Sequence, residues 1–279
     1  MTVATRNVRG GSAWLAGISA RAGVLAIAAA LLAIPGLAQD EADGKPEAKK
    51  RSVRLLAVGD QPLFRADLRD GVLRERELAD GVLPPAAVKA PIGKDKELST
   101  QLLMGNFSRV LDVPGSLQKL RLRDALGEES KTWTEVMLPE GSDPLLILLW
   151  RDPELGKWTR ARHLVLRDAP AAVPPGSLRV VNVTGGLAGV RIGDEEKTVA
   201  LKPGLNVVRR SAAGKALPVS VAVRGRDGEW LRLFQGEVEP GRGERSLIVI
   251  YRSDGEAPRR PAKVKVLTDR VGPVSGSGD

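Results

Sequence analysis

The chain of 279 residues contains no cysteine. This absence excludes disulfide bonds, thiolate metal sites, a cysteine nucleophile and lipid attachment at a cysteine. An oxidising compartment would permit disulfides, so a fold that works there without them must be stabilised by its apolar core. The length makes this feasible, because it suits one large domain or two ordinary ones.

Aromatic side chains make up only 3% of the sequence, and histidine occurs once. So few aromatic residues argue against a surface that stacks nucleic-acid bases. The formal net charge is +9, but basic and acidic residues alternate finely, as in Arg74-Glu75-Arg76-Glu77. Nucleic-acid-binding proteins concentrate positive charge on one face, so we expect no nucleic-acid partner.

The first 38 residues have the three parts of a secretory signal peptide. Arg6, Arg9 and Arg21 precede or flank an apolar run over 22–34, with no acid before it. Gly36-Leu37-Ala38 then offers small residues before a cleavage site. We therefore expect a signal peptide over 1–38 and a periplasmic or extracellular protein. Cleavage would remove three of the 43 basic residues and none of the 34 acids, which lowers the net charge from +9 to +6.

Two alternatives to a cleaved signal stay open. The apolar stretch could be retained as a membrane anchor, but it has only about 17 residues, where a spanning helix needs roughly 20. The shorter length favours cleavage and leaves no membrane span in the mature chain. The leading segment is long for a signal, so the true start codon could also lie downstream.

The rest of the chain divides at stretches of distinctive composition. Residues 39–51 are charged and lack large apolar groups, which predicts a flexible spacer. The segment 169–176 carries three prolines and predicts an extended linker between a domain over 52–168 and one over 177–269. Residues 270–279 are rich in glycine and serine and predict a disordered tail.

Both predicted domains have the sequence pattern of β-structure. Short apolar or alternating runs are separated by turn residues such as Asp70-Gly71 and Asp227-Gly228, which is typical of a sandwich or barrel. We therefore predict an all-β fold of two tandem immunoglobulin-like β-sandwich domains, with an insertion near 72–100 in the first. The runs span 53–58, 63–68, 117–122, 133–138, 145–150, 158–166, 178–183, 187–192, 197–201, 205–208, 217–224, 230–235 and 247–251.

The two domains also resemble each other in sequence. Residues 145–168 align without a gap on 246–269, and 52–58 align on 177–183. Apolar alternation alone can produce such a match between strands. Matched charged residues are harder to explain in that way, and these segments contain several. The alignment therefore predicts an internal repeat, with the two domains related by duplication.

Two arginines at equivalent positions are the candidates for contact with a ligand or partner. Arg151 and Arg252, here called the strand-end arginines, each follow a continuously apolar strand. A guanidinium at the end of a strand could grip a carboxylate with its planar fork. The alternative is a structural role, either as a cap of the strand end or in an ion pair inside each domain, with Asp168 or Asp269 as the partner.

His163 is the only histidine, and its strand places it on one face with Ala161 and Val165. Its counterpart in the second domain is Val264. We therefore expect a neutral, hydrogen-bonded residue in the core or at its rim, and neither a catalytic base nor a metal ligand. The sequence contains no G-x-S-x-G motif and no glycine-rich nucleotide motif, so we predict no catalytic residues and no cofactor.

Acidic residues are plentiful but scattered. The densest group is Asp152 and Glu154, with Glu140 and Asp143 in the preceding loop. Calcium prefers several oxygen ligands, but the matching turn of the second domain offers only Asp254 and Glu256, diluted by Arg259 and Arg260. We therefore expect solvated turns here and no metal site. A carboxylate pair of the glycosidase type has no more support.

These features favour an exported, non-catalytic β-sandwich protein that binds or scaffolds another molecule of the cell envelope, either a protein or a polysaccharide. One alternative is a carboxylate-dependent hydrolase acting on envelope glycans. The other is a periplasmic assembly chaperone, because tandem immunoglobulin-like domains, basic charge and this length are similar to that family. That resemblance stops at gross architecture, since no proline follows the Tyr251-Arg252 pair where the family has an Arg-Pro run.

Overall fold

The computed structural model describes the chain from the first strand to the last. The predicted signal peptide and nearly all of the predicted spacer and tail lie outside the described residues. At the edges the predicted spacer and tail extend too far, because Lys50 and Arg51 already belong to the first strand and Arg270 ends the last one. The described ranges are 49–62, 66–75, 78–94, 96–127, 131–194, 197–210, 215–225, 227–254 and 258–270.

Within these ranges the chain forms eighteen strands and no helix, which confirms the all-β prediction. Accordingly, no helix in the described part is long and apolar enough to cross a membrane. The strands are β1 (Lys50–Val58), β2 (Ala66–Arg69), β3 (Val72–Glu75), β4 (Ala87–Pro91), β5 (Glu97–Gln101), β6 (Leu111–Pro114), β7 (Lys119–Asp124), β8 (Thr132–Met137), β9 (Leu145–Asp152), β10 (Lys157–Arg167), β11 (Ser177–Asn182), β12 (Ala188–Ile192), β13 (Val199–Leu201), β14 (Asn206–Arg210), β15 (Leu217–Arg224), β16 (Trp230–Val238), β17 (Glu244–Arg252) and β18 (Ala262–Arg270).

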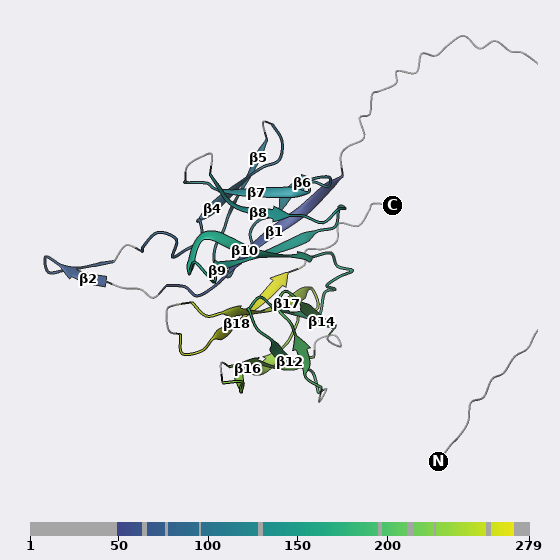
Figure 1. The fold of residues 1–279 in the computed structure, drawn as a ribbon. Helices are drawn as coiled ribbons and strands as arrows, with labels where there is room; N and C mark the ends of the chain where they lie inside the picture. The colour runs from purple at the N-terminus through teal and green to yellow at the C-terminus, as the bar shows by residue number, and fades with distance from the viewer. Residues whose placement is uncertain are drawn as a thin grey trace, which may run out of the picture. The chain divides into compact units, whose positions relative to one another are not determined.

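The strands build two β-sandwiches, each made of two four-stranded sheets (Figure 1). The first sandwich pairs the sheet β10-β9-β1-β6 with the sheet β5-β4-β7-β8. The second pairs β18-β17-β11-β14 with β13-β12-β15-β16. Strand for strand, the two sandwiches have the same order. If the strands of each sandwich are numbered one to eight along the chain, leaving out β2 and β3, one sheet contains strands one, four, seven and eight. An immunoglobulin constant domain groups its strands differently, as ABED in one sheet and CFG in the other.

The two sandwiches also share their strand register. In the first, β1 runs parallel to β9 with Val53 opposite Leu145, and in the second β11 runs parallel to β17 with Leu178 opposite Ser246. The sequence alignment places these same residues on one another. The neighbouring antiparallel ladders β9–β10 and β17–β18 keep the correspondence. The alignment made from sequence therefore describes equivalent positions in space.

One hairpin distinguishes the first sandwich from the second. Strands β2 and β3 form a two-stranded unit that projects from the sandwich (Figure 1), with the side chains of Leu68 and Leu73 about 70% exposed. The predicted insertion near 72–100 was therefore wrong in its extent. Residues 87–101 form β4 and β5, which occupy the places of β12 and β13. Strands β4 and β5 bury alternate residues only and therefore lack a long apolar run that would mark them in the sequence.

Each sandwich encloses its own apolar core, and a third core lies between the sandwiches. Strand β9 shows how one run of leucines serves two cores. Leu145, Ile147 and Leu149 face the inside of the first sandwich, whereas Leu146 and Leu148 face the second. All five are buried, because alternate side chains of a strand point to opposite faces. The continuously apolar strand is therefore covered on both sides.

The core between the sandwiches is built from equivalent residues of the two halves. Strands β1 and β9 meet β11 and β17 through their outer faces, so each sandwich presents the same surface to the other. Such a contact is self-complementary, as in a two-fold symmetric dimer, although both halves lie in one chain. Its buried members are Leu56, Val58, Leu146, Leu148 and Leu166 from the first sandwich, and Val181, Val183, Leu247, Val249 and Tyr251 from the second.

The proline-rich segment between the sandwiches is a compact turn and not the extended linker that was predicted. The amides of Ala172 and Val173 both donate to the carbonyl of Ala169, and Val173 is buried. The hydroxyl of Ser177 donates to the carbonyl of Pro174. These bonds satisfy the backbone where the prolines cannot donate, and they fix the connection beside the interface.

Candidate ligand groove between the sandwiches

A cluster of four charged side chains, here called the ion cluster, closes one end of the interface. Arg54 places Nη2 at 2.6 Å from Asp168 and at 2.7 Å from Asp269. Arg245 contacts the same two carboxylates, at 3.2 and 2.5 Å. No side chain of the four is more than 17% exposed. The cluster is neutral overall and joins residues of both sandwiches.

The predicted ion pairs of the strand-end arginines with Asp168 or Asp269 were therefore wrong. Both carboxylates are already held by Arg54 and Arg245. Burial alone would raise the pKa of Asp269, but the hydrogen bond from Arg54 and the positive charges of Arg54 and Arg245 hold it below its ordinary value of 3.8. The same pairing more than offsets the effect of burial on Arg54 and raises the pKa of its guanidinium.

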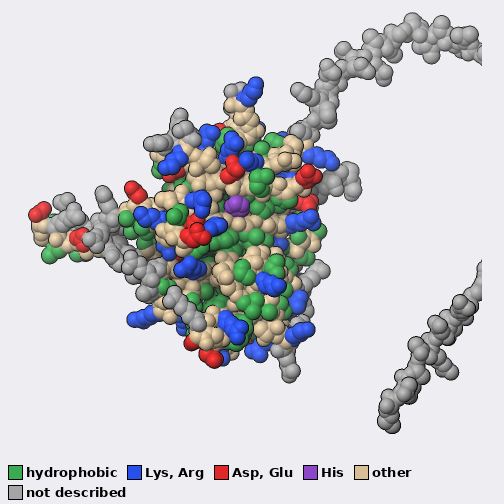
Figure 2. Space-filling view, in the orientation of Figure 1, with side chains coloured by type: hydrophobic (Ala, Val, Ile, Leu, Met, Phe, Trp, Pro, Cys, Tyr) green, Lys and Arg blue, Asp and Glu red, His purple; other side chains and the backbone are tan. Residues whose placement is uncertain are grey.

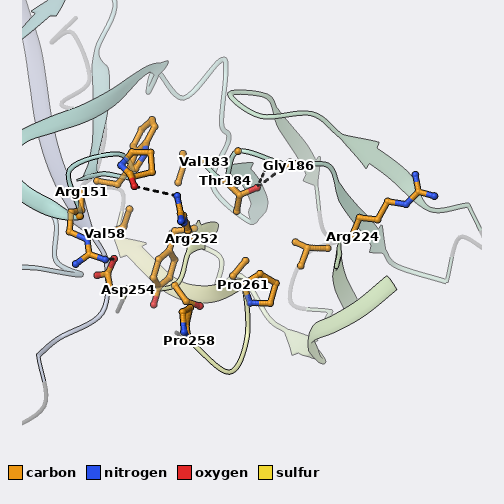
Figure 3. A pocket seen from close by; sticks show the side chains of 18 residues that line it. Val58, Arg151, Val183, Thr184, Gly186, Arg224, Arg252, Asp254, Pro258 and Pro261 are labelled. Atoms are coloured by element: carbon orange, nitrogen blue, oxygen red, sulfur yellow. Dashed lines mark hydrogen bonds and ion pairs between the residues drawn. The ribbon is translucent and has the colours of Figure 1, made fainter. Parts of the chain in front are cut away.

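The strand-end arginines lie at the opposite end of the interface, and each one reaches across to the other sandwich (Figure 3). Arg151 places Nη2 at 2.8 Å from Oδ1 of Asp254. Arg252 donates from Nη1 to the carbonyl oxygen of Pro153, at 3.3 Å. The structure thus brings together the two arginines that the sequence singled out, in a reciprocal arrangement that follows the symmetry of the sandwiches.

Asp60, which follows β1, fastens this end of the interface. Its amide donates to Oδ2 of Asp254 at 2.9 Å, and the amide of Asp254 donates back to Oδ2 of Asp60 at 3.0 Å. The hydroxyl of Tyr251 and the ammonium of Lys263 also donate to Asp60. Burial opposes the charge of Asp60, but the bond from Lys263 and the other donors lower its pKa, whereas burial raises the pKa of Asp254.

Tyr251 is the only tyrosine of the chain, so its ionisation reports on this contact alone. Burial raises the pKa of its phenol, and the neighbouring charge of Asp60 raises it further above the ordinary 10.0. We expect the ultraviolet absorbance of tyrosinate to appear well above pH 10 in the folded protein and at about pH 10 after unfolding. The contribution of the phenol to stability is present below that pH and is lost as the pH rises.

The Asp60→Asn variant provides the matched comparison, because it removes the charge and keeps the size of the side chain. In this variant the titration of Tyr251 should shift part of the way back toward its ordinary value. A phenol that titrated at its ordinary pH in the folded parent would mean that the two sandwiches do not meet at Asp60.

Beside these contacts lies a groove with a volume of about 420 Å³, which is within the size range of small-ligand sites. Both sandwiches line it. Apolar side chains make most of its walls, among them Val58, Val183, Pro258 and Pro261. Its described polar side chains include three arginines and a single acid, Asp254. Positive charge therefore exceeds negative charge by two in the lining.

The groove also contains two uncharged polar side chains, those of Thr184 and Ser253. The side chain of Thr184 bonds to Asn182 and to the carbonyl of Gly186, which fixes the loop that forms one wall. Ser253 also lines the groove and is 2% exposed. Its hydroxyl has no hydrogen-bond partner within the described part of the chain, although a buried hydroxyl normally has one.

The other predicted positions lie away from the groove or serve the fold. His163 is half-buried on the face of Ala161 and Val165, and burial lowers the pKa of its imidazole, in line with a neutral residue at the rim of the core. Asp152 is fully buried and pairs with Arg160 at 2.8 Å, so its predicted exposure to solvent was wrong. Among the described residues no group of acids and histidines is placed to hold a metal ion.

No local sequence pattern singles out Asp60, Tyr251 or Ser253. The partners of Asp60 and Tyr251 lie about two hundred residues away along the chain, and Ser253 has no described partner. For Arg54 a weak signal exists, because an arginine inside the apolar run of β1 must either reach solvent or find a buried acid.

Lys and Arg are spread over the visible face of the molecule, with acidic and apolar side chains between them (Figure 2).

No protein-family model matches the chain, and a comparison with curated proteins finds no match. One solved structure that resembles it is that of a candidate cell adhesion protein from Bacteroides eggerthii DSM 20697. The similarity has a TM-score of 0.21 at 6% sequence identity, and covers 80% of this chain and 97% of that one.

Proposed function

We propose that this chain is an exported, non-catalytic protein of the cell envelope, and that it binds another molecule in the groove between its two sandwiches. The observation that supports the proposal most is the groove itself, which is lined from both halves and includes both strand-end arginines. The signal-peptide pattern of residues 1–38 supports export, and the proposal includes cleavage of that segment.

We further propose that the two sandwiches arose by duplication. Their shared strand order, their shared register and the matched residues of their interface support this origin. A duplicated pair that packs face to face gives a rigid body with a groove at the seam. Loops carried on a rigid scaffold are common sites of binding.

The two alternatives gain no support from the groove. A hydrolase of the carboxylate type needs two acids facing one space. Among the described residues the groove lining has one acid, Asp254, whose two oxygens accept bonds from Arg151 and from the amide of Asp60. An assembly chaperone would offer a long apolar edge strand. The edge strand β10 instead carries charged residues and bonds to Thr134 of β8.

Filling the groove should abolish the binding of the envelope partner. Gly186 lies in the lining, has open space where a side chain would begin and has no left-handed backbone. We expect Gly186→Trp to fold like the parent but to lose, in cross-linking from intact cells, the partner that the parent captures. Gly243→Trp is the matched control, because Gly243 has the same open surroundings at the other end of β17.

The partner captured by the parent is identified by mass spectrometry, and the intact mass of the purified chain reports whether residues 1–38 were removed. If Gly186→Trp retained the partner at the parental level, the groove would not be its binding site.

A further inference from the structure

The groove contains a place where the symmetry of the two sandwiches is broken. The alignment that describes equivalent positions pairs Arg151 with Arg252 and Pro153 with Asp254. Arg151 finds the carboxylate of Asp254 at 2.8 Å. Arg252 makes the reciprocal contact, but it meets only the neutral carbonyl of Pro153, at 3.3 Å. Among the described residues, one arginine of the pair therefore has a carboxylate partner and the other has none.

The surroundings of Arg252 increase this imbalance. Its guanidinium has five N–H donors, and the bond to Pro153 is the only one it makes to a described residue. The next position, Ser253, stands where the first sandwich has the buried acid Asp152, so a second negative charge is also missing. In Figure 3 Arg252 lies beside the loop of Thr184 and Gly186, whereas Arg224 points away from this group.

From this we infer that the groove binds a peptide through its carboxylate, with Arg252 as the anchor and the hydroxyl of Ser253 as an additional donor. The inference rests on the proposed function and names the class of ligand. The contact between Arg151 and Asp254 shows that a carboxylate fits a strand-end arginine in this setting. A ligand carboxylate would supply the partner that Pro153 cannot, in a charge-assisted bond.

A peptide fits the walls better than a sugar acid or an inorganic anion does. Pro258 and Pro261 present small apolar surfaces, which suit apolar side chains and leave the hydroxyl groups of a sugar without partners. Phosphate would pair with the arginine but would leave these walls uncovered. Tyr251 is 6% exposed and packs in the core between the sandwiches, so Trp150, which is half-buried, is the aromatic side chain of the described lining that a ligand can contact.

The test uses the full chain and the tripeptide acetyl-Val-Pro-Val, once with a free carboxylate and once as its amide, in titration calorimetry. We expect the acid to bind, and the amide to bind more weakly by a factor on the order of ten or more, because a charged hydrogen bond is lost. Arg252→Gln should weaken binding of the acid by a similar factor. Arg109→Gln removes an exposed arginine of the first sandwich and should bind like the parent.

A second variant guards against misfolding as an explanation. Pro153→Asp would give Arg252 an internal carboxylate, so this variant should lose the tripeptide while its thermal midpoint stays equal to the parent or rises. Equal binding of the acid and the amide, or undiminished binding by Arg252→Gln, would overturn the inference. So would a parent that binds phosphate or glucuronate through Arg252 as tightly as the tripeptide.

Failure of this inference can be distinguished from failure of the proposed function. If the parent bound neither tripeptide while Gly186→Trp still lost its envelope partner, the ligand class would be wrong and the groove would remain a binding site. If the parent bound neither tripeptide and Gly186→Trp kept the envelope partner, the groove would be excluded as a binding site. The proposed function and the inferred ligand class would then both be wrong.

Discussion

The Asp269→Asn substitution should lower the free energy of unfolding by about 3 kcal/mol, because it removes one partner from a buried ion pair. Asp269 receives hydrogen bonds from both Arg54 and Arg245. After the substitution these two guanidinium groups share the single carboxylate of Asp168, so one buried positive charge is left uncompensated. Urea unfolding at pH 7 measures the effect, with an unchanged dependence on urea concentration expected.

The acid dependence of the same variant gives an independent check. Because the pKa of Asp269 is lowered in the folded protein, its contribution to stability is present above the ordinary value of 3.8 and is lost as the pH falls through the folded pKa. Parent and variant should therefore converge in acid. Glu135→Gln is the control, since Glu135 pairs with Lys119 and Arg121 on the surface and exposed pairs contribute little. A difference between parent and Asp269→Asn that persisted in strong acid would contradict this account.

The Leu148→Glu substitution should separate the two sandwiches without unfolding either of them. Leu148 is fully buried in the core between the sandwiches and does not belong to the core of its own sandwich. A glutamate there would bury an unpaired charge, at a cost on the order of several kcal/mol. Opening the interface avoids that cost. We therefore expect one calorimetric transition in the parent and two in the variant.

Two further measurements support the interpretation of that experiment. The titration of Tyr251 should return to its ordinary pH in Leu148→Glu, because opening the interface exposes the phenol. Leu148→Met conserves volume, so it should cost less than about 1.5 kcal/mol and keep a single transition. If Leu148→Glu also unfolded in a single transition with Tyr251 still shifted, the two sandwiches would not be held together by this core.

Much of the fold could be predicted because strands leave a local pattern. The uninterrupted apolar run 145–149 has no polar face, so both of its faces had to be covered, and both are. The sequence did not reveal what covers the second face. An apolar face can pack on a sheet of its own domain, on the other domain or on a partner, and the alternation of residues is the same in each case.

The candidate site was predictable only in part. Equivalent positions and strand ends were enough to single out the strand-end arginines, and both line the groove. Their partners were not predictable, because distance along the chain carries no information on contacts between sandwiches. The match of Asp254 with Pro153 was visible in the alignment. Its consequence for Arg252 was not, because each strand-end arginine contacts the turn of the other sandwich, and only the three-dimensional structure shows this.

The most direct test of the central claim is a spin-label distance measurement between the two outer sheets. The absence of cysteine allows labels to be placed at Met137→Cys and Arg232→Cys alone, on β8 and β16, where both side chains are exposed. If the sandwiches are fixed to each other through their equivalent faces, the distances form one narrow distribution, which broadens when Leu148→Glu is added. A broad distribution without Leu148→Glu would contradict the claim.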